Sequence, residues 1–481
     1  MNRLVFYPFV LLCALLAPVS ISAFGCPFSE LSRTTITLDL LGRVLPTTRS
    51  GNSDTATRSY LYDTEQRLCQ LTEPESDALV MSYDLSGNLD WSAEGRVSAN
   101  DCATARTNVP AINKIQRAYE KRNWLNSIDY PATAGLPSAD AQNTYFADGQ
   151  LKTLSSGGSG WTYIYNSLRK INSETLNFQN RNFLIDWNYD SQGAIDSITY
   201  PNNETTAFTP NVLGQASQLG SLISATRWHP SGTNASWTFG NGIQRALTQT
   251  SRKLPDRLTD SGSDSAVIFD EDLKYDENGN VTAITDTRDP TLNRTLSYDA
   301  QDRLTQAQGV WGSGSMTYDG ADNLKTQTIG AKNYTYTYTN QKLQTISNPT
   351  QTLFSLGDDA KGNQTQKNGQ SLTWDKASRI ARADGKAQYR YDGHGRRLLV
   401  EKLDANNQPT GNLTLQIYSQ AGKLFYEEAI TSSTAGADVI FDNGFEQNGT
   451  TYHYLDKTLV ARTDAQNTIT TTTYSHTKLP G

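Results

Sequence analysis

A short motif recurs along this chain, and its spacing limits what the chain can fold into. The motif reads Tyr-Asp-x-x-Gly-x-aliphatic, and its complete copies span Tyr83–Leu89, Tyr189–Ile195 and Tyr275–Val281. Looser copies keep an aromatic residue and, six positions later, an aliphatic one; they begin at Tyr62, Tyr145, Tyr165, Tyr298, Tyr318, Trp374 and Tyr418. From position 298 to position 358, successive copies, some of them degenerate, start 20 residues apart. This period predicts an array of small units that pack on one another, because one such unit cannot bury a hydrophobic face alone.

Each position of the motif has a structural role. An Asp that opens a four-residue turn accepts hydrogen bonds from the turn's own backbone, and a Gly at the fourth position adopts a conformation that other residues resist. The aromatic residue is expected to pack against its aliphatic partner across the turn. The predicted structural anchors of the repeat are Tyr83, Asp84, Gly87, Tyr189, Asp190, Gly193, Tyr275, Asp276 and Gly279.

Strands are predicted on both sides of each turn. Residues 334–339 alternate Tyr and Thr, which places the three tyrosines on one face of a strand and the three threonines on the other. The predicted fold is all-β, with tandem β-hairpin repeats that form one long coiled antiparallel sheet, an open shell or collar. The pattern requires no helix.

Composition and charge narrow the function classes. Hydrophobic residues make up 36% of the chain, too few for a thick, dry core, while 10% aromatic residues are too many for a disordered chain. The 42 Lys and Arg against 49 Asp and Glu give a net charge of -7. This balance excludes a phosphate-tracking surface, so nucleic acid is not expected as a partner.

The N-terminus has the pattern of an export signal. An apolar run from Leu4 to Val19 follows Arg3 and is followed by small residues, so we predict a signal peptide over residues 1–23. The run is too short to span a membrane comfortably, and no later segment is apolar enough to do so. In an alternative interpretation, the residues before Cys26 form a lipoprotein box, and Cys26 is lipidated. In the oxidising space outside the membrane, Cys69 and Cys102 are predicted to pair.

The tandem motifs, together with residues 389–398 (Tyr-Arg-Tyr-Asp-Gly-His-Gly-Arg-Arg-Leu), resemble the YD repeats of the bacterial Rhs family. The resemblance covers residues 60–459, after an N-terminal segment at 24–59 and before a truncated last repeat or tail at 460–481. It implies a spiral β-strip that forms a hollow shell around a toxin or other cargo. Family members with a toxin continue into a core segment with an Asp-Pro-x-Gly signature and then an effector domain, neither of which is present before Gly481. The chain is therefore expected to be a shell without those regions.

The sequence predicts no catalytic, cofactor-binding or metal-binding residues. The sequence has no nucleophile elbow, zinc-protease, phosphate-loop or Cys-x-x-Cys motif. Asp358 and Asp359 are interpreted as turn residues rather than as paired catalytic carboxylates. The scattered histidines are interpreted as structural: His229, His394, His453 and His476. Arg390, Arg396 and Arg397 form the densest basic cluster, interpreted as a solvated turn.

Two functions are therefore weighed, and neither is enzymatic. The first is an exported repeat scaffold that resembles the shell portion of Rhs-type toxin systems, a carrier of an effector or cargo protein or an orphan remnant of such a system. The alternative is a secreted or surface-attached module that binds cell-surface glycans through its rows of tyrosines.

Overall fold

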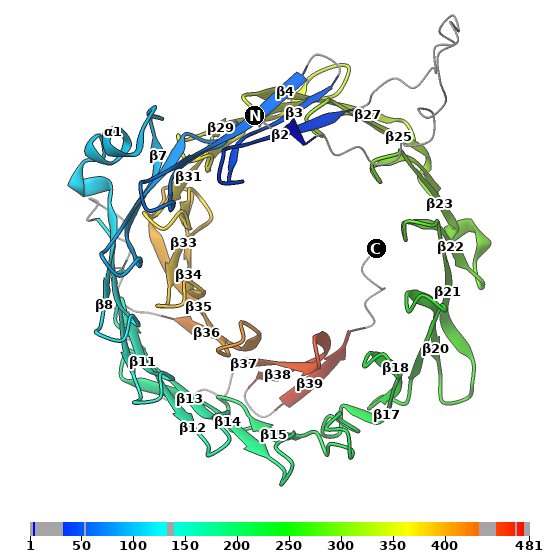
Figure 1. Cartoon of the computed structure of the whole chain (residues 1–481). Helices are drawn as coiled ribbons and strands as arrows, with labels where there is room; N and C mark the ends of the chain where they lie inside the picture. The colour runs from blue at the N-terminus through cyan, green and yellow to red at the C-terminus, as the bar shows by residue number, and fades with distance from the viewer. Residues whose placement is uncertain are drawn as a thin grey trace, which may run out of the picture. The chain divides into compact units, whose positions relative to one another are not determined.

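The computed structural model describes residues 3–4, 32–51, 54–131, 139–431, 449–466 and 469–475. More than half of these residues lie in antiparallel strands, in two sheets of 16 and 23 strands (Figure 1). Within each sheet every strand lies beside its neighbours in the sequence. The helices of the described part are α1 (Cys102–Thr107) and the short 3-10 helices η1 (Ala111–Asn113) and η2 (Pro290–Leu292).

The strands of the first sheet are, in order, β1 (Arg3–Leu4), β2 (Arg33–Leu38), β3 (Val44–Gly51), β4 (Asp54–Tyr62), β5 (Leu68–Thr72), β6 (Ala78–Tyr83), β7 (Leu89–Arg96), β8 (Ile115–Tyr119), β9 (Leu125–Asp129), β10 (Ala141–Tyr145), β11 (Leu151–Ser156), β12 (Ser159–Tyr165), β13 (Ile171–Phe178), β14 (Arg181–Tyr189), β15 (Ile195–Thr199) and β16 (Thr205–Ala207).

The strands of the second sheet are β17 (Ile223–Trp228), β18 (Asn234–Phe239), β19 (Gln244–Gln249), β20 (Pro255–Ser261), β21 (Val267–Tyr275), β22 (Val281–Asp286), β23 (Arg294–Tyr298), β24 (Leu304–Gly309), β25 (Gly312–Tyr318), β26 (Leu324–Ile329), β27 (Lys332–Thr339), β28 (Lys342–Ser347), β29 (Thr352–Asp358), β30 (Gln364–Lys367), β31 (Gln370–Trp374), β32 (Ile380–Ala383), β33 (Ala387–Tyr391), β34 (Arg397–Leu403), β35 (Pro409–Tyr418), β36 (Leu424–Thr431), β37 (Gly449–Leu455), β38 (Thr458–Gln466) and β39 (Ile469–Tyr474).

The all-β, antiparallel prediction is confirmed, but the expected single sheet is divided in two. The division falls between β16 and β17, where residues 208–222 form turns and isolated bridges such as Pro210 with Ala216. Pro210 has no N–H to donate to a ladder, and Gly214 and Gly220 have positive φ angles, so this segment cannot continue as a regular strand.

The repeat pattern requires no helix and does not predict α1. Asp101 caps its N-terminus by accepting a hydrogen bond from the Thr104 N–H at 2.9 Å. The helix packs against β5 and β6. A single turn of helix is not stable alone, so its tertiary contacts hold it.

By internal contacts the chain forms two units, each containing strands from both sheets. Unit 1 comprises residues 1–117 and 314–371, and unit 2 comprises residues 118–313 and 372–481. These bounds differ from the predicted segments 24–59, 60–459 and 460–481, because contacts between strands distant in the sequence define the units. In unit 1, for example, the Asp77 N–H donates to the Ala360 carbonyl at 2.8 Å, and Arg49 pairs with Asp322.

Unit 2 has a hydrophobic core between strands of the two sheets. Figure 1 shows β12–β15 beside β36–β38. Alternate side chains of β12 to β14 and of β35 and β36 are buried in this core, among them Trp161, Leu176, Ile185, Leu415 and Phe425. Burial of each such side chain stabilises the fold by roughly 1.5–3 kcal/mol. In unit 2 the buried hydrophobic side chains are therefore concentrated where strands of the two sheets face each other.

Candidate functional site: the repeated turn and the contacts that link it

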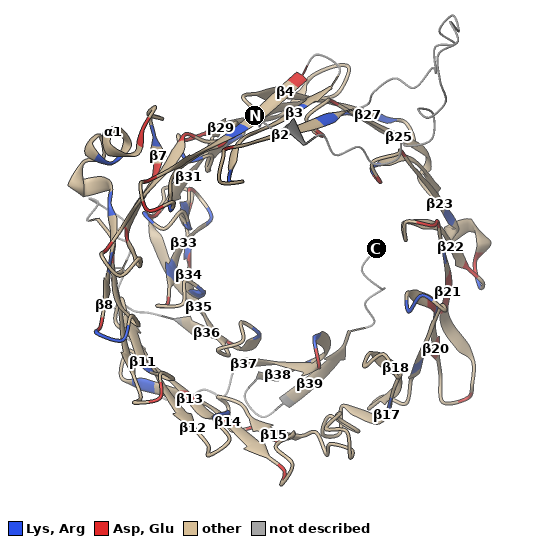
Figure 2. Ribbon diagram, in the orientation of Figure 1, with Lys and Arg blue, Asp and Glu red and all other residues tan. Residues whose placement is uncertain are grey.

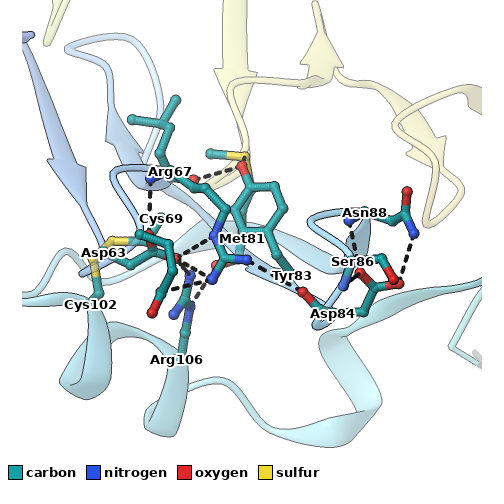
Figure 3. Close-up of polar contacts among 12 residues, drawn as sticks. Asp63, Arg67, Cys69, Met81, Tyr83, Asp84, Ser86, Asn88, Cys102 and Arg106 are labelled. Atoms are coloured by element: carbon teal, nitrogen blue, oxygen red, sulfur yellow. Dashed lines mark hydrogen bonds and ion pairs between the residues drawn. A yellow bond between two sulfur atoms is a disulfide. The ribbon is translucent and has the colours of Figure 1, made fainter.

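The repeated motif forms the same hydrogen-bonded turn at each complete copy. The Asp84 carboxylate accepts from the backbone N–H groups of Ser86 at 2.8 Å and Asn88 at 2.9 Å (Figure 3). The Gly87 N–H donates to the Asp84 carbonyl at 3.1 Å. These are the bonds of a four-residue turn that opens with Asp.

The other two complete copies repeat this geometry. The Asp190 carboxylate accepts from the N–H groups of Gln192 and Ala194 at 2.9 and 2.8 Å, and the Asp276 carboxylate accepts from the Asn280 N–H at 2.8 Å. The glycines have φ angles of 85° (Gly87), 81° (Gly193) and 95° (Gly279). Only Gly adopts such angles at little cost, so the fourth turn position is restricted to it or to a strained residue.

Each turn contains a shift of strand register that brings the two ends of the motif together. Tyr83 lies opposite Leu89, Tyr189 opposite Ile195 and Tyr275 opposite Val281. The register shifts immediately before each of these tyrosines. Such a bulge increases the local twist and turns the ring toward the aliphatic partner.

The sixth motif position has a role that the sequence reasoning missed. Where the residue four positions after the Asp is Asn or Arg, as in the copies that follow, its side chain donates to the second oxygen of the Asp carboxylate; Ala194 of the second complete copy has no such donor. Asn88 donates to Asp84 at 2.9 Å, and Arg303 donates to Asp299 at 2.7 Å. The hydrogen bond from Asn88 is the main cause that lowers the pKa of Asp84. The available signal was the recurrence of Asn or Arg directly after the turn's Gly position.

In several repeats the tyrosine hydroxyl forms a link to the repeat before it. Tyr83 donates to the Leu68 carbonyl at 2.8 Å, and Leu68 closes the preceding motif. The same bond to the aliphatic residue of the preceding motif is made by Tyr145 to Leu125, Tyr189 to Ile171, Tyr298 to Val281, Tyr338 to Leu324 and Tyr391 to Ile380. This bond explains why the motif begins with Tyr rather than with Phe.

Arginines at the sixth position complete the link. The Arg67 guanidinium lies over the ring of Tyr83, 5.0 Å from its centroid, and donates to the Asp84 carbonyl at 3.3 Å (Figure 3). Arg379 lies over Tyr391 in the same way, at 4.6 Å. These two turns are thus joined to the next by a cation–π contact, the nearest-neighbour pattern of a repeat protein.

The structure joins Cys69 of β5 to Cys102 of α1 in a disulfide, with a Cα–Cα distance of 5.7 Å (Figure 3). The bond attaches α1 to the repeat, where Arg106 donates to Asp63 at 2.9 Å. Burial opposes ionisation of Asp63, but hydrogen bonds from Arg106 and Arg67 lower its pKa to about 2. The predicted signal peptide other than Arg3–Leu4, the alternative lipidation residue Cys26, and His476 lie outside the described residues.

The remaining candidate residues are held by neighbouring groups. Asp359 caps a turn, whereas Asp358 accepts from Gln344 at 3.2 Å. In the basic cluster, Arg396 donates to the carbonyls of Ser419 and Gln420, and Arg397 donates to Gln416. The part of the chain that the structure describes contains no group of three His, Cys, Asp or Glu residues that could hold a metal ion.

The described histidines lie in separate hydrogen bonds. His229 bonds the Leu247 carbonyl, and His394 bonds the Tyr163 hydroxyl at 2.6 Å. His453 is fully buried and bonds Thr463 at 2.9 Å; burial lowers its pKa to about 4. A histidine with so low a pKa is neutral at physiological pH, and it satisfies hydrogen bonds inside the core of unit 2.

Buried polar contacts join strands of different sheets within unit 2. Glu174 is 1% exposed, and it accepts from the Trp187 indole N–H at 2.9 Å and the Gln420 backbone N–H at 2.5 Å. The two hydrogen bonds lower the pKa of Glu174, but burial raises it by more, and the result is a pKa of about 7. Arg181 donates to both carboxylate oxygens of Glu428, at 3.0 and 2.9 Å. Such contacts require one relative placement of the two strands that make them.

Comparison with known proteins agrees with this geometry. The family model for the RHS Repeat matches residues 275–309, which begin at the third complete motif. The chain therefore contains an RHS repeat at these residues. No curated protein matches it significantly.

Solved structures share the fold of this chain. The Tc holotoxin pore of Photorhabdus luminescens is similar over 91% of the chain, with 17% identity and a TM-score of 0.59. The crystal structure of TcdB2–TccC3 without its hypervariable C-terminal region is similar over 92% of the chain, with 16% identity and a TM-score of 0.58. In both comparisons the chain spans 27% of the length of the matched chain.

Proposed function

We propose that this RHS-repeat protein is a non-enzymatic scaffold, the carrier portion of a toxin system or an orphan remnant of one, and that its partner is an effector or cargo protein. The observation that carries the proposal is the shared fold: more than nine tenths of the chain superimposes on parts of Tc toxin complexes. The chain resembles a part of those larger proteins, so the role of a part, to support or surround another protein, is the one we assign.

The chemistry of the repeat supports a structural role. The carboxylates of the motif bind the backbone of their own turns, and the tyrosine hydroxyls bind the preceding repeat. Charged residues of both signs are interspersed along the strands of each unit (Figure 2). Groups already engaged in this way are poor candidates for a catalytic acid, base or nucleophile.

Export is part of the proposal. The apolar N-terminal run is the pattern of a secretory signal, and disulfides such as Cys69–Cys102 persist in oxidising compartments. Among the described residues, no helix is both long and apolar enough to cross a membrane.

The test is co-expression of the tagged full chain with the proteins encoded by the neighbouring reading frames. We expect one of these proteins to co-purify through size-exclusion chromatography and to resist a protease that degrades it when expressed alone. In the matched control, the chain is added only after the neighbour protein has folded. If the protease resistance requires the two proteins to fold together, this addition should give none. Failure of every neighbour protein to co-purify or gain protection would overturn the carrier function.

The glycan-binding alternative has weaker support. In β27 the tyrosines at 334, 336 and 338 are half-buried and the intervening threonines are exposed, as the alternation predicts. The hydroxyls of Tyr336 and Tyr338 are bonded within the sheet, to Gln327 and to the Leu324 carbonyl. Saturable binding of a cell-surface glycan by a chain that protects no neighbour protein would favour this alternative.

A further inference from the structure

Unit 2 contains a cavity of about 470 Å³ that the repeat geometry does not explain. Its walls come from both sheets: Trp187 and Ile198 from β14 and β15, Phe425 and Tyr454 from β36 and β37, and Trp228 from β17. The volume lies within the range of roughly 300–1,000 Å³ that small-ligand sites occupy.

The walls of this cavity offer aromatic ring surface. The Trp187 indole N–H is bonded to Glu174, and the Trp228 indole N–H is bonded to the Ala216 carbonyl at 2.9 Å. Phe425 packs against Trp187 at 5.6 Å and against Tyr454 at 6.1 Å between ring centroids. Because both indole N–H groups are already used, the tryptophans can contribute only their rings to a ligand.

Two lysines at turn positions provide positive charge at the same cavity. Lys170 donates to the Gly193 carbonyl, and Lys423 donates to the Asp456 carbonyl. An ammonium group has three protons, so each lysine retains two for another acceptor. The cavity lining thus includes these two lysines and one acidic residue, Asp456. Burial lowers the pKa of Lys423, so an anion placed beside it would replace solvation that the group has lost.

Apolar residues are exposed in the turns that border the cavity. Leu168 is 59% exposed, Val212 84% and Leu213 77%. The last two precede Gly214 and Gln215, which line the cavity, and the turn of Leu168 contributes Lys170. Exposed apolar side chains that adjoin a pocket are typical of ligand sites.

We propose that this cavity binds a small aromatic carboxylate, with its ring between the aromatic walls and its carboxylate on Lys423 and Lys170. A sugar fits the cavity less well, because it needs several paired hydrogen-bond donors and acceptors, whereas this wall offers rings, two ammonium groups and few other polar side chains. The proposal does not rest on the carrier function, because binding of a small ligand in this cavity requires no partner protein.

Equilibrium dialysis of the full chain against 2-naphthoate tests the proposal. We expect saturable binding at one site, about a hundredfold weaker for the neutral analogue 2-naphthalenemethanol, since it loses both ion pairs and each is taken as about one power of ten in affinity. Lys423→Met removes one of the two ion pairs and is expected to weaken 2-naphthoate binding about tenfold. Lys342→Met is the matched control: Lys342 also donates to a turn carbonyl, that of Asp359 at 3.0 Å, but it lies in unit 1.

Several results would overturn the site. On the parent chain, these results are no saturable binding of 2-naphthoate up to about 5 mM, or equal affinity for 2-naphthoate and its neutral analogue. An unchanged affinity of Lys423→Met for 2-naphthoate, or displacement of 2-naphthoate by methyl glucoside, would also overturn it. Circular dichroism of each variant establishes that it is folded. If Lys423→Met does not fold, Lys170→Met replaces it, and the comparison of charged with neutral ligand on the parent chain needs no variant.

Discussion

Glu174 makes the stability of unit 2 depend on pH in a direction opposite to that of a salt-bridged carboxylate. Its pKa is raised from 4.5 to about 7 in the folded chain, mainly because burial disfavours the charged form. The folded state therefore binds the proton more tightly than the unfolded state does. The stabilisation is complete below pH 4.5, declines as pH rises from there, and is lost above pH 7.

The size of the effect follows from the pKa difference. At about 1.36 kcal/mol per pKa unit, the interval from 4.5 to about 7 corresponds to roughly 3 kcal/mol in the free energy of unfolding. The perturbation is Glu174→Gln, which has the same shape and does not titrate. In this variant, one of the two N–H groups that face the carboxylate would face an amide NH2 instead. This mismatch changes the free energy of unfolding by an amount that does not depend on pH, so the two chains are compared by how their free energies of unfolding vary with pH.

The assay is urea unfolding followed by tryptophan fluorescence, because Trp187 donates directly to Glu174. The free energy of unfolding of the parent minus that of Glu174→Gln should fall by roughly 3 kcal/mol between pH 4.5 and pH 8. Other titrating groups are common to both chains and cancel in this difference. Glu277→Gln, at an exposed turn position, is the matched control for the substitution itself. A difference between parent and Glu174→Gln that is flat across this range would refute the reasoning.

Further predictions concern the repeat, the disulfide and the N-terminus. Tyr298→Phe removes the bond to the Val281 carbonyl and should lower the free energy of unfolding by about 1 kcal/mol in urea titration; an unchanged midpoint would contradict the link between repeats. Gly279→Val should cost about 1–2 kcal/mol because of the φ angle of 95° and leave distant hairpins folded; equal stability of variant and parent would count against the turn. Reduction of Cys69–Cys102 opens a loop with a sequence separation of 33 residues and should destabilise unit 1 by about 4 kcal/mol, measured as a lower melting temperature in dithiothreitol; no change would refute the contribution. Mass analysis of exported protein should find a free amine at Ala23 or Phe24; a diacylglyceryl Cys26 would establish the alternative, and an uncleaved Met1 would contradict both.

The local structure of each repeat follows from the sequence alone. The partners of Asp84, Asp190 and Asp276 lie within the same seven residues, so the motif contains the information for its own turn. The alternation of residues 334–339 likewise predicted that the tyrosines and the threonines lie on opposite faces of a strand. The hydroxyl contact of Tyr83 reaches only to the preceding repeat, and the recurring Asn or Arg at the sixth position could have revealed the second half of the turn's hydrogen bonding.

The tertiary structure alone decided which distant strands meet. Every hairpin carries nearly the same pattern, so no signal in the sequence distinguishes one pairing of layers from another. Glu174 contacts Gln420, 246 positions away, and Arg181 contacts Glu428, 247 positions away. The interruption at residues 208–222 and helix α1 also depend on the packing around them, since a single helical turn cannot hold itself. The cavity in unit 2 exists because these layers meet, and for the same physical reason it has no sequence motif: its lining residues come from separate repeats whose contact is set by burial rather than by local hydrogen bonding.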